Sequence, residues 1–171
     1  MIHARAFTEG PSSVMLSDDA NDVVIADAVR LVHIPEPMPT IDGIELDDTE
    51  AIFTGTWPFS TVSYGYYGSA YRYRWAGVGD NTATWMVNIP EADSWEVYAR
   101  WTSSSNRATD APYTVNHADG STVVLRNQEI NGGSWVSLGV FDFNEGITSI
   151  VLSDDADDVV IADGIKLVKV E

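Results

Sequence analysis

The feature that most constrains this chain is an internal repeat. The segment Glu9 to Val32 (EGPSSVMLSDDANDVVIADAVRLV) recurs without a gap 136 residues later as Glu145 to Val168 (EGITSIVLSDDADDVVIADGIKLV). Sixteen of the 24 paired positions are identical, and most of the differences exchange one apolar residue for another. Segments this similar should adopt the same local structure, as in proteins built from tandem repeats. The sequence therefore predicts the closing part of one repeat, followed by one full repeat.

The repeat divides the chain into three expected parts. Residues 1–33 are interpreted as the closing strand pair of a preceding repeat, residues 34–40 as a linker, and residues 41–171 as a complete domain. Three prolines between His33 and Thr40 favour an extended, semi-rigid linker. Because an isolated strand pair is marginally stable in water, we expect the apolar face of residues 1–33 to pack against its own domain or a neighbouring chain.

The composition argues against several classes of partner. The chain has 26 acidic and nine basic residues, and its formal net charge of −17 at pH 7 repels nucleic-acid backbones and anionic membranes. No apolar run approaches the roughly 20 residues of a membrane-spanning helix. Residues 1–10 lack the apolar stretch of a secretory signal, so we expect any signal to belong to a longer precursor. No cysteine is present, which excludes disulfides and thiolate metal sites.

Alternating apolar and polar residues run through most of residues 41–171. Thr82–Ile89 and Ser94–Thr102 alternate with a period of two, and in Tyr71–Trp75 (YRYRW) the aromatic residues and the arginines fall on opposite faces. Asp119-Gly120 is a hairpin signal, and Val159–Val168 is interpreted as the last strand. No segment has a sustained helical period. The sequence predicts an all-β fold, an antiparallel jelly-roll β-sandwich of about nine strands.

Several long stretches resemble the golvesin C-terminal-like domain, also described as the carbohydrate-binding-like domain of xanthan lyase. They are Phe53–Tyr73, Trp95–Gly120, Asn131–Gly146 and Val159–Val168. The resemblance implies a bacterial β-sandwich that is extracellular, either secreted or held at the cell surface. Such domains are attached to secreted hydrolases or repeated in large surface proteins. The resemblance points to no particular ligand.

An aromatic run provides the first candidate ligand site. Eight aromatic residues lie between Trp57 and Trp75, and we select Trp57, Tyr64, Tyr66 and Tyr67 as candidate contacts to a sugar. Aromatic rings stack on the apolar faces of sugars, and Tyr hydroxyls can hydrogen-bond to sugar hydroxyls. The alternative is that these aromatic residues belong to the core or cover a sheet edge.

A polar loop provides the second candidate. Asn106 and Arg107 lie in Ser105–Tyr113, a segment with the composition of a loop. Loops on a rigid sandwich often carry binding residues. The alternative is a scaffold role, in which Arg107 pairs with a carboxylate or bonds loop carbonyls.

Two equivalent acidic turns are candidate calcium sites. They contain Asp18, Asp19 and Asp22 in the first copy and Asp154, Asp155, Asp157 and Asp158 in the second. Calcium takes about six to eight oxygen ligands, which clustered carboxylates can supply. The spacing does not match an EF-hand, and a solvated acidic turn is the reading we favour. No other cofactor is expected.

Two further aspartates lie within apolar sequence. Asp27 and Asp163 each end a VVIAD run. A carboxylate in such a run requires hydrogen-bond donors if it is buried. We therefore expect a structural, hydrogen-bonding role for both.

The sequence contains no catalytic signature. It lacks an HExxH metal motif, a GxSxG elbow and a glycine-rich phosphate loop, so we expect no enzyme activity. We interpret the chain as an extracellular binding or display module that attaches to a polysaccharide or a cell-surface component. The alternative is a structural repeat of a fibre, stalk or sheath, in which the N-terminal strand pair packs against neighbouring copies.

Overall fold

The computed structural model describes residue 19, residues 21–23 and residues 43–171. The chain divides into two units, Met1–Pro39 and Thr40–Glu171, and the described strands belong to the second. The strand pair expected within residues 1–33 therefore lies outside the described residues, apart from isolated positions. Over the described part of the chain, no helix has the length and apolarity needed to cross a membrane.

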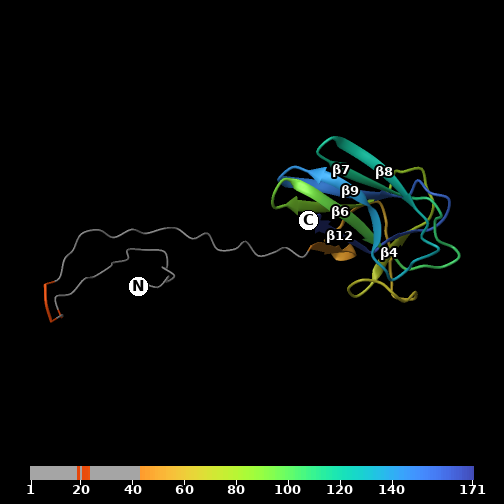
Figure 1. Ribbon diagram of the computed structural model, residues 1–171. Coiled ribbons are helices and arrows are strands. Elements are labelled where there is room, and N and C mark those ends of the chain that lie inside the picture. The colour runs from red at the N-terminus through yellow and green to blue at the C-terminus, as the bar shows by residue number, and fades with distance from the viewer. Residues whose placement is uncertain (1–18, 20, 24–42) are drawn as a thin grey trace. The chain divides into compact units, whose positions relative to one another are not determined.

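The first layer is a four-stranded antiparallel sheet. Its strands, in spatial order, are β1 (Ile44–Asp47), β12 (Gly164–Lys169), β6 (Asp93–Arg100) and β9 (Val136–Phe143). Figure 1 shows β12, β6 and β9 side by side. The register between β6 and β9 shifts between Val97 and Tyr98. This bulge occurs at Leu138, whose side chain is buried.

The second layer is a five-stranded antiparallel sheet. Its order is β2 (Ile52–Thr54), β5 (Thr82–Ile89), β10 (Gly146–Ser153), β7 (Ala111–His117) and β8 (Gly120–Arg126). The predicted hairpin is present, because His117 pairs with Gly120 across a two-residue turn. Gly120 has φ +126°, a backbone conformation that favours glycine.

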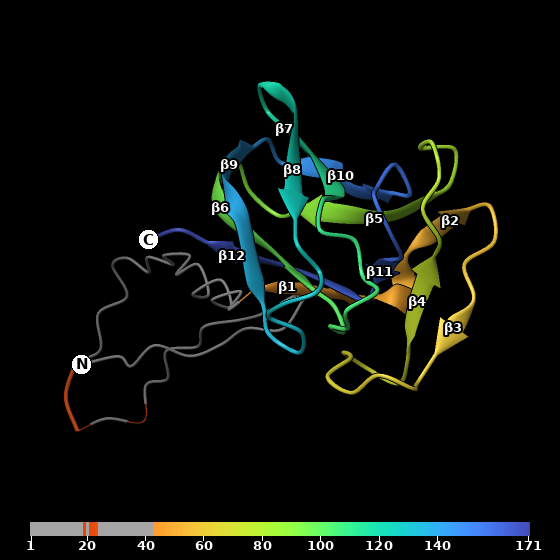
Figure 2. The same cartoon turned by 90° about the vertical axis from the view of Figure 1, so that its right-hand side faces the viewer.

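A small three-stranded sheet lies at one end of the domain (Figure 2). It contains β11 (Val160–Ala162), β4 (Tyr71–Arg74) and β3 (Phe59–Ser60). A short 3-10 helix, η1 (Asp48–Glu50), follows β1. This end of the domain also carries the loops that shape the candidate site.

The predicted fold class is confirmed, and the strand boundaries need correction. The domain is an antiparallel β-sandwich of jelly-roll type, but it has twelve strands. The sequence patterns missed β1, β2 and β3, which are too short for alternation to stand out. The stretch Val159–Val168 was expected to be one strand, and it instead forms β11 and β12, which belong to different sheets and meet at Asp163.

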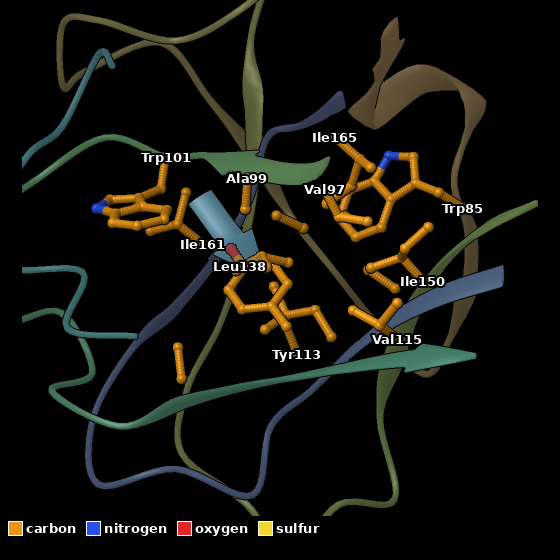
Figure 3. Close-up of a cluster of buried hydrophobic side chains, with 14 of the residues drawn as sticks. Trp85, Val97, Ala99, Trp101, Tyr113, Val115, Leu138, Ile150, Ile161 and Ile165 are labelled. Atoms are coloured by element: carbon orange, nitrogen blue, oxygen red, sulfur yellow. The ribbon is translucent and has the colours of Figure 1, made fainter. Parts of the chain in front are cut away.

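The core lies between the two larger sheets (Figure 3). Trp85, Val115 and Ile150 from the five-stranded sheet face Val97 and Ile165 from the four-stranded sheet. All five side chains are at most 1% exposed. Burying a side chain of this size contributes about 1.5–3 kcal/mol relative to exposure.

The outward side chains of the five-stranded sheet carry no charge, and we call this surface the uncharged face. Because neighbours along a strand point to opposite sides, it consists of Ile52 and Thr54 (β2), Thr82, Thr84, Met86 and Asn88 (β5), Ile147, Ser149, Val151 and Ser153 (β10), Pro112, Thr114 and Asn116 (β7), and Ser121, Val123 and Leu125 (β8).

The outward side of the four-stranded sheet has the opposite character, and we call it the charged face. It carries Glu45, Glu96, Arg100 and Lys166, with Val140 opposite Glu96. Lys166 forms an ion pair with Glu45 at 2.8 Å, between Nζ and Oε1. The Arg100 Nε donates to the backbone oxygen of Gly65 at 3.0 Å, which ties a loop to this face.

Candidate functional site

A hollow of about 350 Å³ opens beside the three-stranded sheet. It combines strand and loop residues that are far apart in the sequence. Its lining consists of Ser60, Val62, Ser63, Tyr71, Tyr73, Trp75, Ser104, Asn106, Arg107 and Val159. The hollow thus brings the predicted aromatic region together with the predicted polar loop.

Strand β4 supplies the aromatic wall of the hollow. The predicted alternation is confirmed, since Tyr71, Tyr73 and Trp75 all line the hollow. On the opposite side of the strand, Arg72 Nη1 donates to the backbone oxygen of Trp57 at 3.0 Å. Burial changes along the row, from a buried Tyr71 to a Trp75 that is 56% exposed. The rings of Tyr73 and Trp75 meet edge to face, with centroids 5.3 Å apart.

The polar wall comes from the loop between β6 and β7. The guanidinium of Arg107 donates to Asn106 Oδ1 at 2.9 Å, to Ser63 Oγ at 3.1 Å and to the Thr102 carbonyl at 3.4 Å. It also lies 6.0 Å from the centre of the Tyr71 ring. None of these partners is a carboxylate. Arg107 therefore joins the β6–β7 loop to the loop that precedes β4, while Asn106 remains exposed.

The chemistry of the lining is mixed and free of carboxylates. It combines three aromatic rings with serine hydroxyls, an amide and one guanidinium. A hollow that combines aromatic rings with placed polar groups suits a small polar molecule with apolar faces. No acid–base pair or nucleophile–base pair lines it, so the arrangement suits binding.

None of the four predicted aromatic contacts lines the hollow, and two of them are held by other parts of the domain. Trp57 is 4% exposed, and its indole Nε1 donates to the Thr54 carbonyl at 3.1 Å. The Tyr67 hydroxyl donates to Glu45 Oε2 at 2.7 Å, and the Tyr67 ring packs edge-on against Trp135. Trp57 is a core residue, and Tyr67 fastens its loop to the charged face.

The other two predicted aromatic contacts differ in exposure. Tyr64 is 93% exposed and adjoins Ser63, which lines the hollow. Tyr66 is half-buried against the core, with its ring 6.2 Å from that of Tyr71. Neither residue lines the hollow itself.

The pattern of the sequence did not single out the most exposed aromatic residue of the hollow. Trp75 and Tyr73 belong to an alternating run, which normally packs into a core. The signal that could have identified Trp75 is its position at the end of the run, immediately before the turn residues 76–80. Ser60, Ser63 and Ser104 carried no signal, because serine is common in any loop.

The four aspartates of the acidic turn after β10 differ in exposure to solvent. Asp155, Asp157 and Asp158 are exposed, but Asp154 is fully buried, so the expectation of a solvated turn is wrong for Asp154. Its carboxylate accepts hydrogen bonds from Asn81 Nδ2 at 2.6 Å, from the Gly79 amide at 2.9 Å, and more weakly from the Asn81 amide. Arg74 Nε lies 3.5 Å away.

The other acidic side chains of the turn bind nearby backbone groups. Asp157 accepts from the Thr109 amide at 2.7 Å and from the Thr109 hydroxyl. Asp158 accepts from the amide of Val159 at 2.7 Å. Within residues 43–171 and the few described positions before them, no three acidic, histidine or cysteine side chains are grouped to hold a metal ion.

Half of the first-copy aspartates lie within the described residues. Asp18 and Asp27 lie outside the described residues. Asp19 and Asp22 are exposed, and Asp22 accepts from the amide of Val23 at 2.7 Å. Calcium binding by either turn stays a prediction.

Asp163 lies at the junction of β11 and β12 and is 1% exposed. Its Oδ1 accepts from the Tyr67 amide at 2.9 Å, whereas Oδ2 has no hydrogen-bond partner among the described residues. Burial, with a smaller contribution from Asp47 and Asp48, raises the pKa of Asp163 to about 8. Burial and the neighbouring Asp47 likewise raise the pKa of Asp48 to about 6, although Arg72 Nε lies 3.2 Å from its carboxylate.

Comparison with known proteins gives one family. Residues 44–169 match the family model described as the Golvesin C-terminal domain. A xanthan lyase from Bacillus sp. (strain GL1) is 33% identical over 139 residues, which cover 78% of this chain and 15% of the lyase. The chain thus spans a small part of that relative.

Solved structures agree with this assignment. The Paenibacillus xanthan lyase structure matches with a TM-score of 0.73 and 33% identity, over 77% of this chain and 13% of that one. A family 35 carbohydrate binding module from Clostridium thermocellum matches with a TM-score of 0.54 and 23% identity, over 75% of this chain and 98% of that one. The second likeness reflects a shared fold.

Proposed function

The chain belongs to the Golvesin C-terminal domain family, and on that premise we propose that it is a non-catalytic module that binds polysaccharide through the hollow beside β4. The observation that carries the proposal is Trp75, a large aromatic side chain left 56% exposed at a hollow that also contains Asn106 and Arg107. An exposed ring can stack on the apolar face of a sugar, and the polar groups can bond to its hydroxyls.

The relatives support a role beside polysaccharide-active enzymes. Two similar proteins are named xanthan lyases, and the matching region covers a small share of each. An accessory module of a secreted enzyme holds the enzyme near its substrate. We extend this to the present chain and propose an extracellular bacterial location, with a polysaccharide or cell-surface partner.

A second candidate function is a structural repeat of a fibre, stalk or sheath. The observation in its favour is the duplicated segment Glu9 to Val32, which a single binding module does not require. This candidate predicts that the chain assembles without any sugar.

Affinity electrophoresis of the full chain through gels containing neutral or acidic polysaccharides tests the binding function. We expect retardation by at least one polysaccharide, and Trp75→Ala should weaken binding about 10-fold or more, as loss of a stacking ring does. The matched control is Phe59→Ala, because Phe59 is 70% exposed but lies outside the lining of the hollow.

The outcomes separate the alternatives. Absence of retardation on every gel would rule out a polysaccharide ligand of the kinds tested. Equal weakening by Phe59→Ala and Trp75→Ala would show that the binding surface is not confined to the hollow. Weakening by Tyr64→Ala as well would extend the surface toward the exposed loop residue next to Ser63.

A further inference from the structure

The uncharged face contains a continuous row of β-branched side chains. Pairing across the five strands aligns Ile52, Thr84, Val151, Thr114 and Val123. Ile52 is 61% and Val123 is 59% exposed at the two ends of this row. A row of this kind makes a flat surface that another sheet can pack against.

The absence of charge on this face is unusual for this chain. Charged residues make up 20% of the sequence, and the charged face on the other sheet carries several of them. The outer edge strand β8 also has no charged residue before Arg126 and no proline. Exposed edge strands usually carry such residues, because they prevent pairing with other chains.

The internal repeat keeps the same distribution of charge. The outward positions of β10, Ile147, Ser149, Val151 and Ser153, correspond to Pro11, Ser13, Met15 and Ser17 in the first copy. None of these eight residues is charged. In contrast, Lys166 on the charged face corresponds to Arg30, so the basic residue is retained.

We propose that the uncharged face is a self-association surface that packs against the same face of a second copy of this domain. A net charge of −17 makes two copies repel each other, and this repulsion is weakest where the facing surfaces carry no charge. Facing sheets pack about 10 Å apart, which keeps the charged faces on the outside of the pair. Such a contact is isologous, with the same patch on both copies.

The chemistry of the face favours a protein over a sugar. The uncharged face has no aromatic side chain, so it lacks the rings that stack on sugars. The duplicated segment indicates that copies of this unit occur near one another, where tethering raises the effective concentration to about 1 mM. Weak pairing is sufficient at that concentration. The proposal does not rest on the binding of polysaccharide.

Sedimentation equilibrium of the full chain, from about 10 μM to about 1 mM at physiological salt, tests the proposal. We expect reversible dimers. Met86→Glu and Val123→Glu lie in β5 and β8 of the uncharged face. Each should weaken dimerisation about 10-fold or more, because the new carboxylate would be buried without a partner in the dimer interface. The matched control is Val140→Glu, which adds the same charge to a 55%-exposed valine on the charged face.

Each other outcome overturns the proposal. A wild-type chain that is monomeric at about 1 mM has no such surface. Equal weakening by Val140→Glu means that net charge, and not the face, controls association. Weakening by Val123→Glu but not by Met86→Glu means that copies pair through the β8 edge. Thermal melts of all three variants confirm that each is folded.

Discussion

Two buried aspartates in the repeated segment show how differently this domain treats the same side chain. Asp154, at the end of β10, has donors from Asn81, Gly79 and Arg74 around its carboxylate. Burial would raise the pKa of Asp154, but these hydrogen bonds outweigh it and hold the pKa below its ordinary value. Asp163, at the start of β12, has one amide donor, and its pKa rises to about 8.

The difference shows that depth of burial and the number of donors together decide whether a carboxylate is charged inside this domain. Both side chains are at most 1% exposed. Asp154 is stabilised as an anion, and it joins β10 to the turn before β5 and to β4. Asp163 is stabilised as a neutral acid at the point where the chain passes from the three-stranded sheet (β11) to the four-stranded sheet (β12). Three substitutions test this contrast.

The largest effect is expected from Asp154→Ala. Removing this carboxylate leaves Arg74 and the Asn81 and Gly79 donors without a buried partner, which should lower the free energy of unfolding by about 4 kcal/mol. Urea unfolding at pH 7 measures this. The control is Asp155→Ala at the exposed neighbouring position, which should change stability by less than about 0.5 kcal/mol. Similar effects of the two variants would refute the anchoring role of Asp154.

The second effect is the contribution of Asp163 to a pH dependence of stability, which Asp163→Asn should remove. Folded Asp163 keeps its proton up to about pH 8, whereas the unfolded chain loses it near about pH 4. The free energy of unfolding should therefore fall as the pH rises from about 4 to about 8.

Urea unfolding at several pH values measures this slope. In Asp163→Asn the remaining decrease should end near pH 6, because Asp48 has a pKa of about 6. Asp154 contributes with the opposite sign, since its lowered pKa stabilises the fold above about pH 4 and that stability is lost on acidification. A wild-type stability that is flat between pH 5 and 8 would contradict the assignment of Asp163 as a neutral acid.

The smallest effect is expected from Asn81→Ala. This change removes one side-chain donor to Asp154 and leaves the Gly79 and Asn81 backbone donors in place. We expect a loss of about 1 kcal/mol and an upward shift of the Asp154 pKa. NMR titration of the aspartate side chains measures the shift, and an unchanged pKa would show that the backbone donors alone hold the charge.

The sequence predicted the fold class because long strands carry their own pattern. The period-two alternation of Thr82–Ile89 predicted β5, and Asp119-Gly120 predicted the β7–β8 hairpin. The sequence pattern could not reveal the break between β11 and β12, because apolar residues continue on both sides of Asp163. The change of sheet depends on pairing with β4 on one side and with β6 on the other, which are far away in the sequence. The strands β1, β2 and β3 at the start of the domain were missed because each is too short to show an alternating pattern.

The candidate site was predicted only in part, for a related reason. Asn106 and Arg107 line the hollow, as does the aromatic strand. Trp57 and Trp75 are equivalent as residue types, but one is buried and the other exposed. Their exposure depends on which segments pack beside them. The donors of Asp154 are likewise 73 to 80 residues away in sequence, so no local pattern could separate it from its exposed neighbours.

The position of β12 has a consequence for biosynthesis. This strand comes last in the domain, yet it pairs with β1 on one side and with β6 on the other. Until the ribosome has released Gly164–Lys169, the opening strand has no partner in its sheet, and one edge of β6 stays open. The domain should therefore complete its fold only after its final residues emerge. Until then the open edge of β6 can pair with other chains, and a short delay limits this risk of aggregation.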